Sequence, residues 1–370
     1  MVTRQLEPAL ELIAADAAEA ERRGRLADEV VGALAAAGVF SALVPTSIGG
    51  GESHPGELVA ALEAIAAVDG SAGWCAAVGA TSGLAAGYLG AAPARRLFGD
   101  PESVGAGAFA PRGRLIEQGD GYLLTGRWPL ASGVSHATSV GLGCVHPDHG
   151  ALYAVLPRER VEVIETWDAL GLRATASHDV EVHEVAVAGE EVVALIGGTP
   201  TAAGPLYSFP LFGLLAVSIA AVCTGIARGA LAETLAAAGS RKPQGSGRSL
   251  AERGTTQERV AGAEAALRAA RAGLGAAIDC AWETAASGAP LGLDDRLGLR
   301  LAATHAARAA VEVVDACHRL GGAAALPRGS ALERRLRDIR TAAQHMIVAP
   351  ATLELAGRAL LGLEADATQL

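Results

Sequence analysis

The chain has 370 residues, of which 51% are hydrophobic and only 4% aromatic, so its core must consist mainly of Ala, Leu and Val. This length exceeds what one compact core usually needs, and two or three domains are expected. With 30 basic and 40 acidic residues the formal net charge is −10, which argues against a nucleic-acid binder and disfavours an anionic membrane surface as a partner.

Residues 1–105 are predicted to form helices. Leu6, Leu10 and Ile13 recur at helical spacing, and a second apolar stripe runs from Leu26 to Leu34. The acidic side chains among the first 25 residues are unlike those of a signal peptide. A Gly-rich turn at 44–51 precedes a helix predicted over 55–68, and the segment 69–71 (DGS) is expected to stop that helix and cap the next.

Residues 106–204 have the sequence pattern of a β-domain. Short runs rich in Val, Leu and Ala are separated by clusters of Gly, Pro, Asp and His, and no helix-length segment intervenes. This pattern is typical of a small antiparallel barrel or sandwich. The strands are predicted over residues 121–128, 140–145, 151–156, 161–164 and 180–187.

Residues 205–370 are predicted to form a bundle of four long helices, at 214–238, 256–287, 294–320 and 330–362. The uncharged stretch 206–227 is long enough to span a membrane. Because it contains Pro210 and Gly213 and is the only such stretch in the sequence, we interpret it as a buried bundle helix, and no membrane partner is expected.

The five cysteines are far apart and form no C-x-x-C pair, which argues against a disulfide framework or a zinc site and favours a reducing cytoplasm. Histidines are scattered through the central region without the spacing of metal ligands, so no metal is expected.

Motifs in all three regions resemble, in order and spacing, those of the acyl-CoA dehydrogenase superfamily. The matching segments are residues 34–40 (LAAAGVF) with 44–51, residues 69–74 (DGSAGW), residues 126–133 (GRWPLASG), Trp167 with residues 171–180, and the bundle positions 321–345. The resemblance implies a mainly helical α+β fold. It would comprise an N-terminal helical domain (1–105), a central small antiparallel β-barrel domain (106–204) and a C-terminal four-helix bundle (205–370).

Within that superfamily the chain resembles the two-component (group D) flavin-dependent monooxygenases, the branch of the oxygenase components of p-hydroxyphenylacetate hydroxylase and dibenzothiophene monooxygenase. The features shared with this branch are Trp128 followed by Ser132, Thr175 followed by Ser177, and His345 after Gln344. The resemblance implies a flavin cofactor, FAD or FMN, taken in reduced form from a partner reductase. It also implies hydroxylation, or oxygenation at nitrogen or sulfur, of a small aromatic or natural-product-like substrate.

Two departures from the dehydrogenases favour this branch. Dehydrogenases carry T-E-P-x-x-G-S-D in the β-domain, where this chain has AFAPRG at 108–113, and many carry a catalytic Glu in an E-G-T turn, where this chain has His345 and Met346. A second hypothesis is an FAD-dependent acyl-CoA or acyl-carrier dehydrogenase with an altered base. A third is a non-catalytic oligomeric scaffold of the same fold.

The resemblance assigns catalytic roles to His345, as a general base, and to Ser132, beside flavin N5. An imidazole with a pKa of about 6.5 can take a phenolic proton near neutral pH. The structural alternatives are a core histidine bonded to a carbonyl and a turn serine before Gly133.

The resemblance also assigns flavin contacts and an oligomer. The flavin contacts would come from Trp128, Leu130, Ala131 and Ser132, from the backbone of Phe109, Ala110 and Pro111, and, across a subunit interface toward the phosphates, from Arg241, Ser246 and Gln257. Arg173, Thr175 and Ser177 are expected near the flavin or a substrate phosphate. Bundle helices that are apolar on more than one face predict a homotetramer or a dimer.

Overall fold

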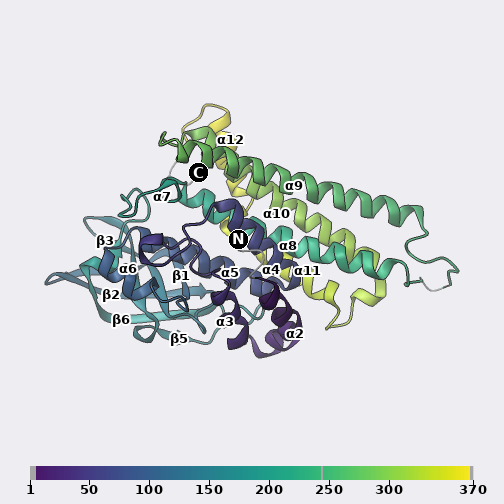
Figure 1. Ribbon diagram of the computed structural model, residues 1–370, viewed down its shortest axis with the longest axis horizontal. Helices are drawn as coiled ribbons and strands as arrows, with labels where there is room; N and C mark the ends of the chain where they lie inside the picture. Colours follow the sequence, from purple (N-terminus) through teal and green to yellow (C-terminus); the bar gives the residue numbers. More distant parts are fainter. Residues whose placement is uncertain (1–5, 243–244, 367–369) are drawn as a thin grey trace.

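The computed structural model describes residues 6–242, 245–366 and 370 and has three consecutive parts (Figure 1). The N-terminal part contains α2 (Glu7–Arg23), α3 (Asp28–Ala36), η1 (Thr46–Ile48), α4 (Pro55–Val68), α5 (Gly70–Ser82), η2 (Gly83–Gly87) and α6 (Ala91–Phe98). The predicted break between α4 and α5 is confirmed, because the Asp69 carboxylate accepts a hydrogen bond from the Ala72 amide at 2.9 Å and caps α5.

The central part is one seven-stranded sheet with the order β5-β6-β2-β1-β3-β4-β7. Its elements are β1 (Gly105–Gln118), β2 (Gly121–Ala131), β3 (Ser139–His146), β4 (Gly150–Pro157), η3 (Arg158–Arg160), β5 (Glu162–Ile164), β6 (His178–Ala188), η4 (Gly189–Glu191) and β7 (Val192–Val193). The expectation of wholly antiparallel pairing is wrong at one place, where β1 and β3 run parallel. β2 already occupies the other edge of β1, so the chain crosses over through residues 132–138 before β3 begins.

The C-terminal part is the bundle. It contains α7 (Pro205–Ser208), α8 (Leu211–Ala238), α9 (Gly254–Ala286), α10 (Leu293–Gly321), η5 (Gly322–Ala325), α11 (Ala331–Ala342), η6 (Met346–Val348) and α12 (Ala351–Leu360). The single last helix predicted over 330–362 is wrong. His345 has an extended backbone, with ψ 130°, and Pro350 begins the next turn, so the chain breaks between α11 and α12.

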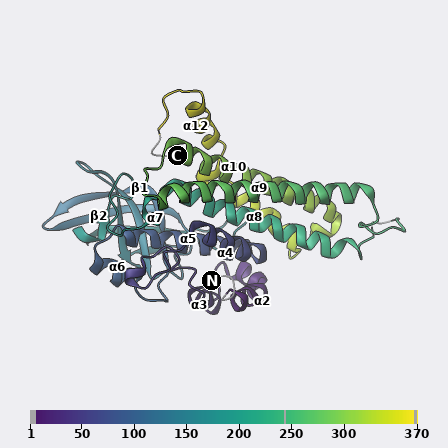
Figure 2. The same ribbon diagram turned by 45° about the horizontal axis from the view of Figure 1, so that its top comes forward.

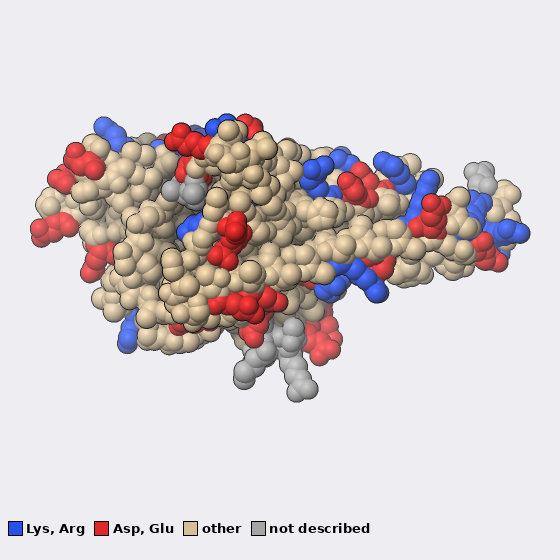
Figure 3. All heavy atoms as spheres, turned by 90° about the horizontal axis from the view of Figure 1, so that it is seen from above, with Lys and Arg blue, Asp and Glu red and all other residues tan. Residues whose placement is uncertain are grey.

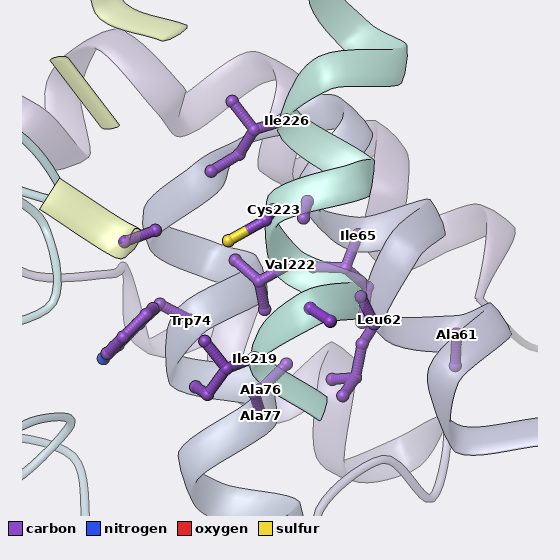
Figure 4. Packing of buried hydrophobic residues seen from close by; sticks show 14 of the residues in the cluster. Ala61, Leu62, Ile65, Trp74, Ala76, Ala77, Ile219, Val222, Cys223 and Ile226 are labelled. Carbon is purple, nitrogen blue, oxygen red and sulfur yellow. The ribbon is translucent and has the colours of Figure 1, made fainter. Parts of the chain in front are cut away.

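α8 is the central helix of the molecule. It contacts α4, α5, α9, α10 and α11, and its Ile219, Val222 and Ile226 pack among side chains of α4 and α5 (Figure 4). It is the only described helix long and apolar enough to cross a membrane, with a mean hydropathy of 1.9, but 78% of that apolar window is buried inside the protein. The interpretation of this segment as a core helix therefore agrees with its packing.

The bundle extends well beyond the sheet. α8, α9 and α10 lie side by side along this extension, and the loop that joins α8 to α9 lies at its far end (Figures 1 and 2). Lys and Arg side chains gather mainly on this extension in the view of Figure 3, interspersed with acidic ones. The opposite ends of α8 and α10 face the sheet, and the candidate site lies there.

Candidate functional site

Ser132 begins a chain of buried hydroxyl groups directly after β2. Its Oγ lies 2.7 Å from Ser177 Oγ, and Ser177 Oγ lies 2.6 Å from Thr175 Oγ1. From the helical side, Trp74 of α5 donates its indole N–H to Ser132 Oγ at 3.0 Å. The structure therefore brings the predicted residues Ser132, Thr175 and Ser177 together and adds Trp74, which belongs to the motif at 69–74 but had no predicted role at the site.

The direction of this hydrogen-bond chain follows from its end. Thr175 donates to the carbonyl oxygen of Leu172 at 2.9 Å, and a carbonyl can only accept. Ser177 must then donate to Thr175, and Ser132 must donate to Ser177. Because Ser132 already accepts from Trp74, its oxygen retains one free lone pair, and Ser132 is available to a ligand only as an acceptor.

Backbone conformation at the site is unusual. Leu130, Leu172 and Ala176 have positive φ values of 63°, 51° and 44°, although none is glycine. Leu130 precedes a tight turn in which the Ser132 amide donates to the Leu130 carbonyl at 2.9 Å. Strained residues of this kind persist where the surrounding structure fixes them, and they are common at functional sites.

His345 lies at the break between α11 and η6, with its ring edge-on to Trp74 at a centroid distance of 5.6 Å. Its Nδ1 accepts from the Ile347 amide at 3.3 Å, so the neutral ring carries its hydrogen on Nε2. Burial, followed by the positive charge of Arg300, lowers the pKa of His345 to about 4. The imidazole is therefore neutral at physiological pH and presents an N–H donor.

The loop that carries Thr175 and Ser177 is anchored to the bundle by Asp338 of α11. The Asp338 carboxylate accepts from the Leu172 amide at 2.6 Å and is 3% exposed. The Asp338 carboxylate lies beside Gly70, the residue that follows the buried Asp69. Burial, and then the charge of Asp69, raise the pKa of Asp338 to about 7.

The residues with predicted flavin contacts occupy different surroundings. The register of β1 against β3 shifts between Ala108 and Gly113, so the backbone of Phe109, Ala110 and Pro111 lies outside that ladder. Leu130 is 62% exposed. Ala131 is fully buried, and Trp128 is fully buried in the β-domain core, where its indole donates to the Gly143 carbonyl at 2.7 Å. The Trp128 ring therefore supports the sheet from inside and has no surface to offer a cofactor.

The predicted phosphate contacts lie apart from this cluster. Arg241 donates to the Gly321 carbonyl at 3.0 Å, Gln257 donates to the Ala251 carbonyl at 2.9 Å, and Ser246 bonds Arg248 within its own loop. Arg241 and Ser246 belong to the connection between α8 and α9, and Gln257 to the first turn of α9; this connection lies at the far end of the bundle (Figure 1). Arg173 is paired with Asp168 at the surface.

Two other features of the molecule bear on ligand binding. A cavity of about 320 Å³ is lined by Leu170, Asp315, His318, Arg319, Leu336, Arg337 and Arg340, and it includes none of the residues that surround Ser132. Among the described residues no group of three or more His, Cys, Asp or Glu side chains could hold a metal ion. The groups that the cluster around Ser132 itself offers are hydroxyl, indole and imidazole.

Comparison with known proteins gives consistent results. Residues 7–92 match the family model described as acyl-CoA dehydrogenase, N-terminal domain, and residues 217–350 match acyl-CoA dehydrogenase, C-terminal domain. The chain is 37% identical over 354 residues to indole-3-acetate monooxygenase of Pseudomonas putida, covering 93% of this chain and 89% of the relative. It is 28% identical to the oxygenase component of FADH(2)-dependent resorcinol hydroxylase of Rhizobium, covering 96% and 92%.

Solved structures have the same fold. The HsaA monooxygenase from M. tuberculosis superposes with a TM-score of 0.92 at 25% identity, covering 100% of this chain and 99% of the other. XiaF from Streptomyces, solved with FADH2 and glycerol, superposes with a TM-score of 0.91 at 24% identity, covering 98% and 95%.

Proposed function

This chain belongs to the flavin-dependent monooxygenases of the acyl-CoA dehydrogenase superfamily, and we propose that Ser132, Trp74 and His345 surround its reaction centre. It is a flavin-dependent oxidoreductase, and reduced flavin, when bound, supplies the two electrons that activate molecular oxygen. The remaining chemistry of the site follows from the hydrogen-bonding capacity of the chain's own groups.

The residues at the site fit a flavin ring. Backbone groups of Phe109, Ala110 and Pro111 lie outside the β1–β3 ladder and can bond the polar edge of the ring. The hydroxyl of Ser132 is held from two sides by Trp74 and Ser177, so its position is fixed before any ligand binds.

The observation that carries the proposal is the free lone pair of Ser132. Reduced flavin has a hydrogen on ring nitrogen N5, whereas N5 of oxidised flavin has only a lone pair. A serine that can only accept stabilises the reduced form and repels the lone pair of the oxidised form. The direction of the hydrogen bonds from Ser132 through Ser177 to Thr175 therefore favours binding of reduced flavin over oxidised flavin.

The proposed role of His345 is donation from Nε2–H to an oxygen atom of the reacting partners. The sequence predicted a general base at this position. A neutral imidazole whose pKa is near 4 is a weak base, while its Nε2–H is oriented by the Nδ1 bond to Ile347. Donation therefore agrees better with this geometry than proton removal.

The proposed substrate is an aromatic compound. Two relatives are named for indole-3-acetate and resorcinol, both aromatic. The dehydrogenase alternative lacks support at this site, because the position of the dehydrogenase carboxylate is occupied by the neutral His345.

A flavin reductase is the proposed partner, because relatives of this chain are named as oxygenase components or subunits. We also propose a homotetramer, or a dimer built on the same pairing. The support is exposed apolar side chains of the C-terminal region: Met346 is 75% exposed, Leu360 67% and Leu361 78%. A second copy would also bring another Arg241 and Gln257 toward the flavin phosphates. A stable monomer in light scattering at micromolar concentration contradicts this assembly.

The test of the acceptor role is anaerobic titration with reduced and with oxidised FMN and FAD. Wild type should bind the reduced form more tightly. Ser132→Ala removes the acceptor and should reduce that preference by about 3- to 30-fold, the equivalent of one hydrogen bond. A preference that is identical in wild type and variant contradicts the role of Ser132.

A further inference from the structure

Arg300 of α10 is a buried cation without a carboxylate partner. Its side chain is 5% exposed. Nη2 donates to Thr352 Oγ1 at 3.2 Å and Nη1 to the Phe212 carbonyl at 3.5 Å, while Nε has no acceptor. Both partners are neutral, and Arg300 forms no ion pair with any residue that the structure describes. Burial lowers the pKa of Arg300 to about 10, which still leaves it charged at physiological pH.

Arg335 of α11 provides a comparison within the same chain. It is 8% exposed and its Nε also lacks an acceptor. However, Glu233 lies 3.9 Å from its Nη2, and the charges of Asp69 and Asp338 also act on it. Acidic residues therefore supply counter-charge to Arg335, whereas none in the described part of the chain does so for Arg300. A buried charge without compensation costs several kcal/mol, so buried charges are normally paired.

Arg300 lies beside the site. Its positive charge contributes to the lowered pKa of His345. Phe212, whose carbonyl accepts from Arg300, packs its ring edge-on against Phe109 at 5.7 Å, and Phe109 belongs to the β1 segment that we propose contacts the flavin ring. One helical turn after Arg300, on the same face of α10, the fully buried hydroxyl of Thr304 also lacks a partner.

We propose that Arg300 binds an anionic group of the substrate, so that the enzyme acts on aromatic acids, with a carboxylate as the group recognised. A guanidinium binds a carboxylate through a planar pair of N–H donors, and such charge-assisted bonds are about twice as strong as neutral ones. Nε and one Nη supply such a pair, and the Thr304 hydroxyl lies on the same side of α10. This assignment rests on the proposed function, because it places the aromatic ring between Arg300 and His345.

The test uses substrates paired by presence and absence of the carboxylate: indole-3-acetate with 3-methylindole, and 4-hydroxyphenylacetate with 4-methylphenol. The measured quantity is the ratio of kcat/KM for the acid to kcat/KM for its neutral partner, with reduced FMN and oxygen. Wild type should prefer the acids. Arg300→Met should lower the ratio by about 10- to 100-fold, mainly through KM, which corresponds to one charged hydrogen-bonding pair. Arg300→Lys keeps the charge but loses the planar fork, and should give an intermediate ratio.

Arg335→Met is the matched control, since it removes a similarly buried guanidinium that has acidic partners. It should lower the melting temperature but keep the wild-type ratio. Equal ratios in wild type and Arg300→Met overturn the proposal. So does an unchanged ratio together with weaker binding of reduced FMN, which would assign Arg300 to the flavin phosphate.

If wild type oxygenates neither pair, the proposed function fails, and ligand-induced melting shifts test the anion site separately. The acids should then raise the melting temperature of wild type more than their neutral partners do, and this difference should vanish in Arg300→Met. Equal shifts for acids and neutral compounds in wild type overturn the assignment.

Discussion

The indole N–H of Trp74 donates to the hydroxyl of Ser132 at 3.0 Å, across 58 positions of sequence and between the helical part and the sheet. This bond occupies one lone pair of Ser132 and fixes the direction in which the other points. In the proposed function Trp74 therefore acts on the flavin through Ser132, although its own ring packs against His345.

Trp74→Phe keeps most of the ring but removes this donor. Ser132 then gains a second free lone pair and loses one of its two fixed partners. We expect a destabilisation of about 1 kcal/mol and a 3- to 10-fold weaker binding of reduced flavin, the scale of one hydrogen bond. Trp282→Phe is the control, because the ring of Trp282 packs against His54 and Phe209 instead of His345. The measurements are melting temperature and anaerobic flavin titration, and equal effects of both variants on flavin binding contradict this account.

Ser177→Ala should change the preference of the site for flavin redox state. Without Ser177 the hydroxyl hydrogen of Ser132 loses its acceptor and is free to donate to a ligand. Oxidised flavin should therefore bind more tightly to the variant than to wild type, by about 3- to 10-fold. Ser218→Ala, which removes another buried hydroxyl bonded only within α8, should leave flavin binding at the wild-type level. If oxidised flavin binds Ser177→Ala no more tightly than it binds wild type, the direction deduced for this hydrogen-bond chain is wrong.

His345 provides a prediction about pH. Because its pKa is lowered to about 4, the imidazole is neutral throughout pH 5.5–8, and kcat should show no inflection from this residue in that range. His345→Ala should lower kcat by roughly 10- to 1,000-fold, the range for loss of a reaction-centre donor. A change in kcat with a midpoint near pH 6.5, present in wild type and absent from His345→Ala, would instead support a general base of ordinary pKa.

His345→Asn separates catalysis from structure. Asn can still accept from the Ile347 amide and cap η6, because Asn is a favoured capping residue. Its melting temperature should therefore exceed that of His345→Ala, while its kcat should remain low, since the Asn side chain is too short to place an N–H donor at the position of Nε2. Recovery of turnover in the Asn variant would show that His345 serves the fold alone.

Asp338 predicts how stability depends on pH. Burial raises its pKa to about 7 in the folded protein, above the ordinary value of 3.8. The folded state therefore binds more protons than the unfolded state between these values. The contribution of Asp338 to the stability of the folded protein is fully present below pH 3.8 and is lost as the pH rises through 7. Asp338→Asn has no proton to lose and keeps an oxygen for the Leu172 amide. Its melting temperature should fall less than that of wild type between pH 5 and 8.

Asp338→Ala is the control for this prediction, since it leaves the buried Leu172 amide without an acceptor. It should be less stable than the Asn variant at every pH, by about 1–3 kcal/mol. Parallel pH profiles for wild type and Asp338→Asn would show that Asp338 does not titrate in this range.

Much of the fold could be predicted from local sequence. The boundaries of α4 follow from Pro55 at its start and Asp69 after its end, because both residues act within one helical turn. The break in the last predicted helix could not be predicted in the same way. The apolar pattern continues through His345, and Pro350 restricts the backbone only of its immediate neighbours.

The site itself could be predicted only in part. Ser132 and His345 belong to motifs, but the bond from Trp74 and the anchor from Asp338 to Leu172 join positions 58 and 166 residues apart. No periodicity encodes such contacts. Arg300 is one of several arginines on long helices, and its lack of an acidic partner is a property of the tertiary structure alone.

The most direct test of the central claim is a single-turnover reaction of the purified protein with chemically reduced FMN or FAD, ¹⁸O₂ and indole-3-acetate or 4-hydroxyphenylacetate. A monooxygenase of this kind should yield a product containing one ¹⁸O atom, and only when reduced flavin is supplied. Formation of unlabelled hydrogenation or dehydrogenation products, or bleaching of a tightly bound oxidised FAD by an acyl-CoA, would contradict the account.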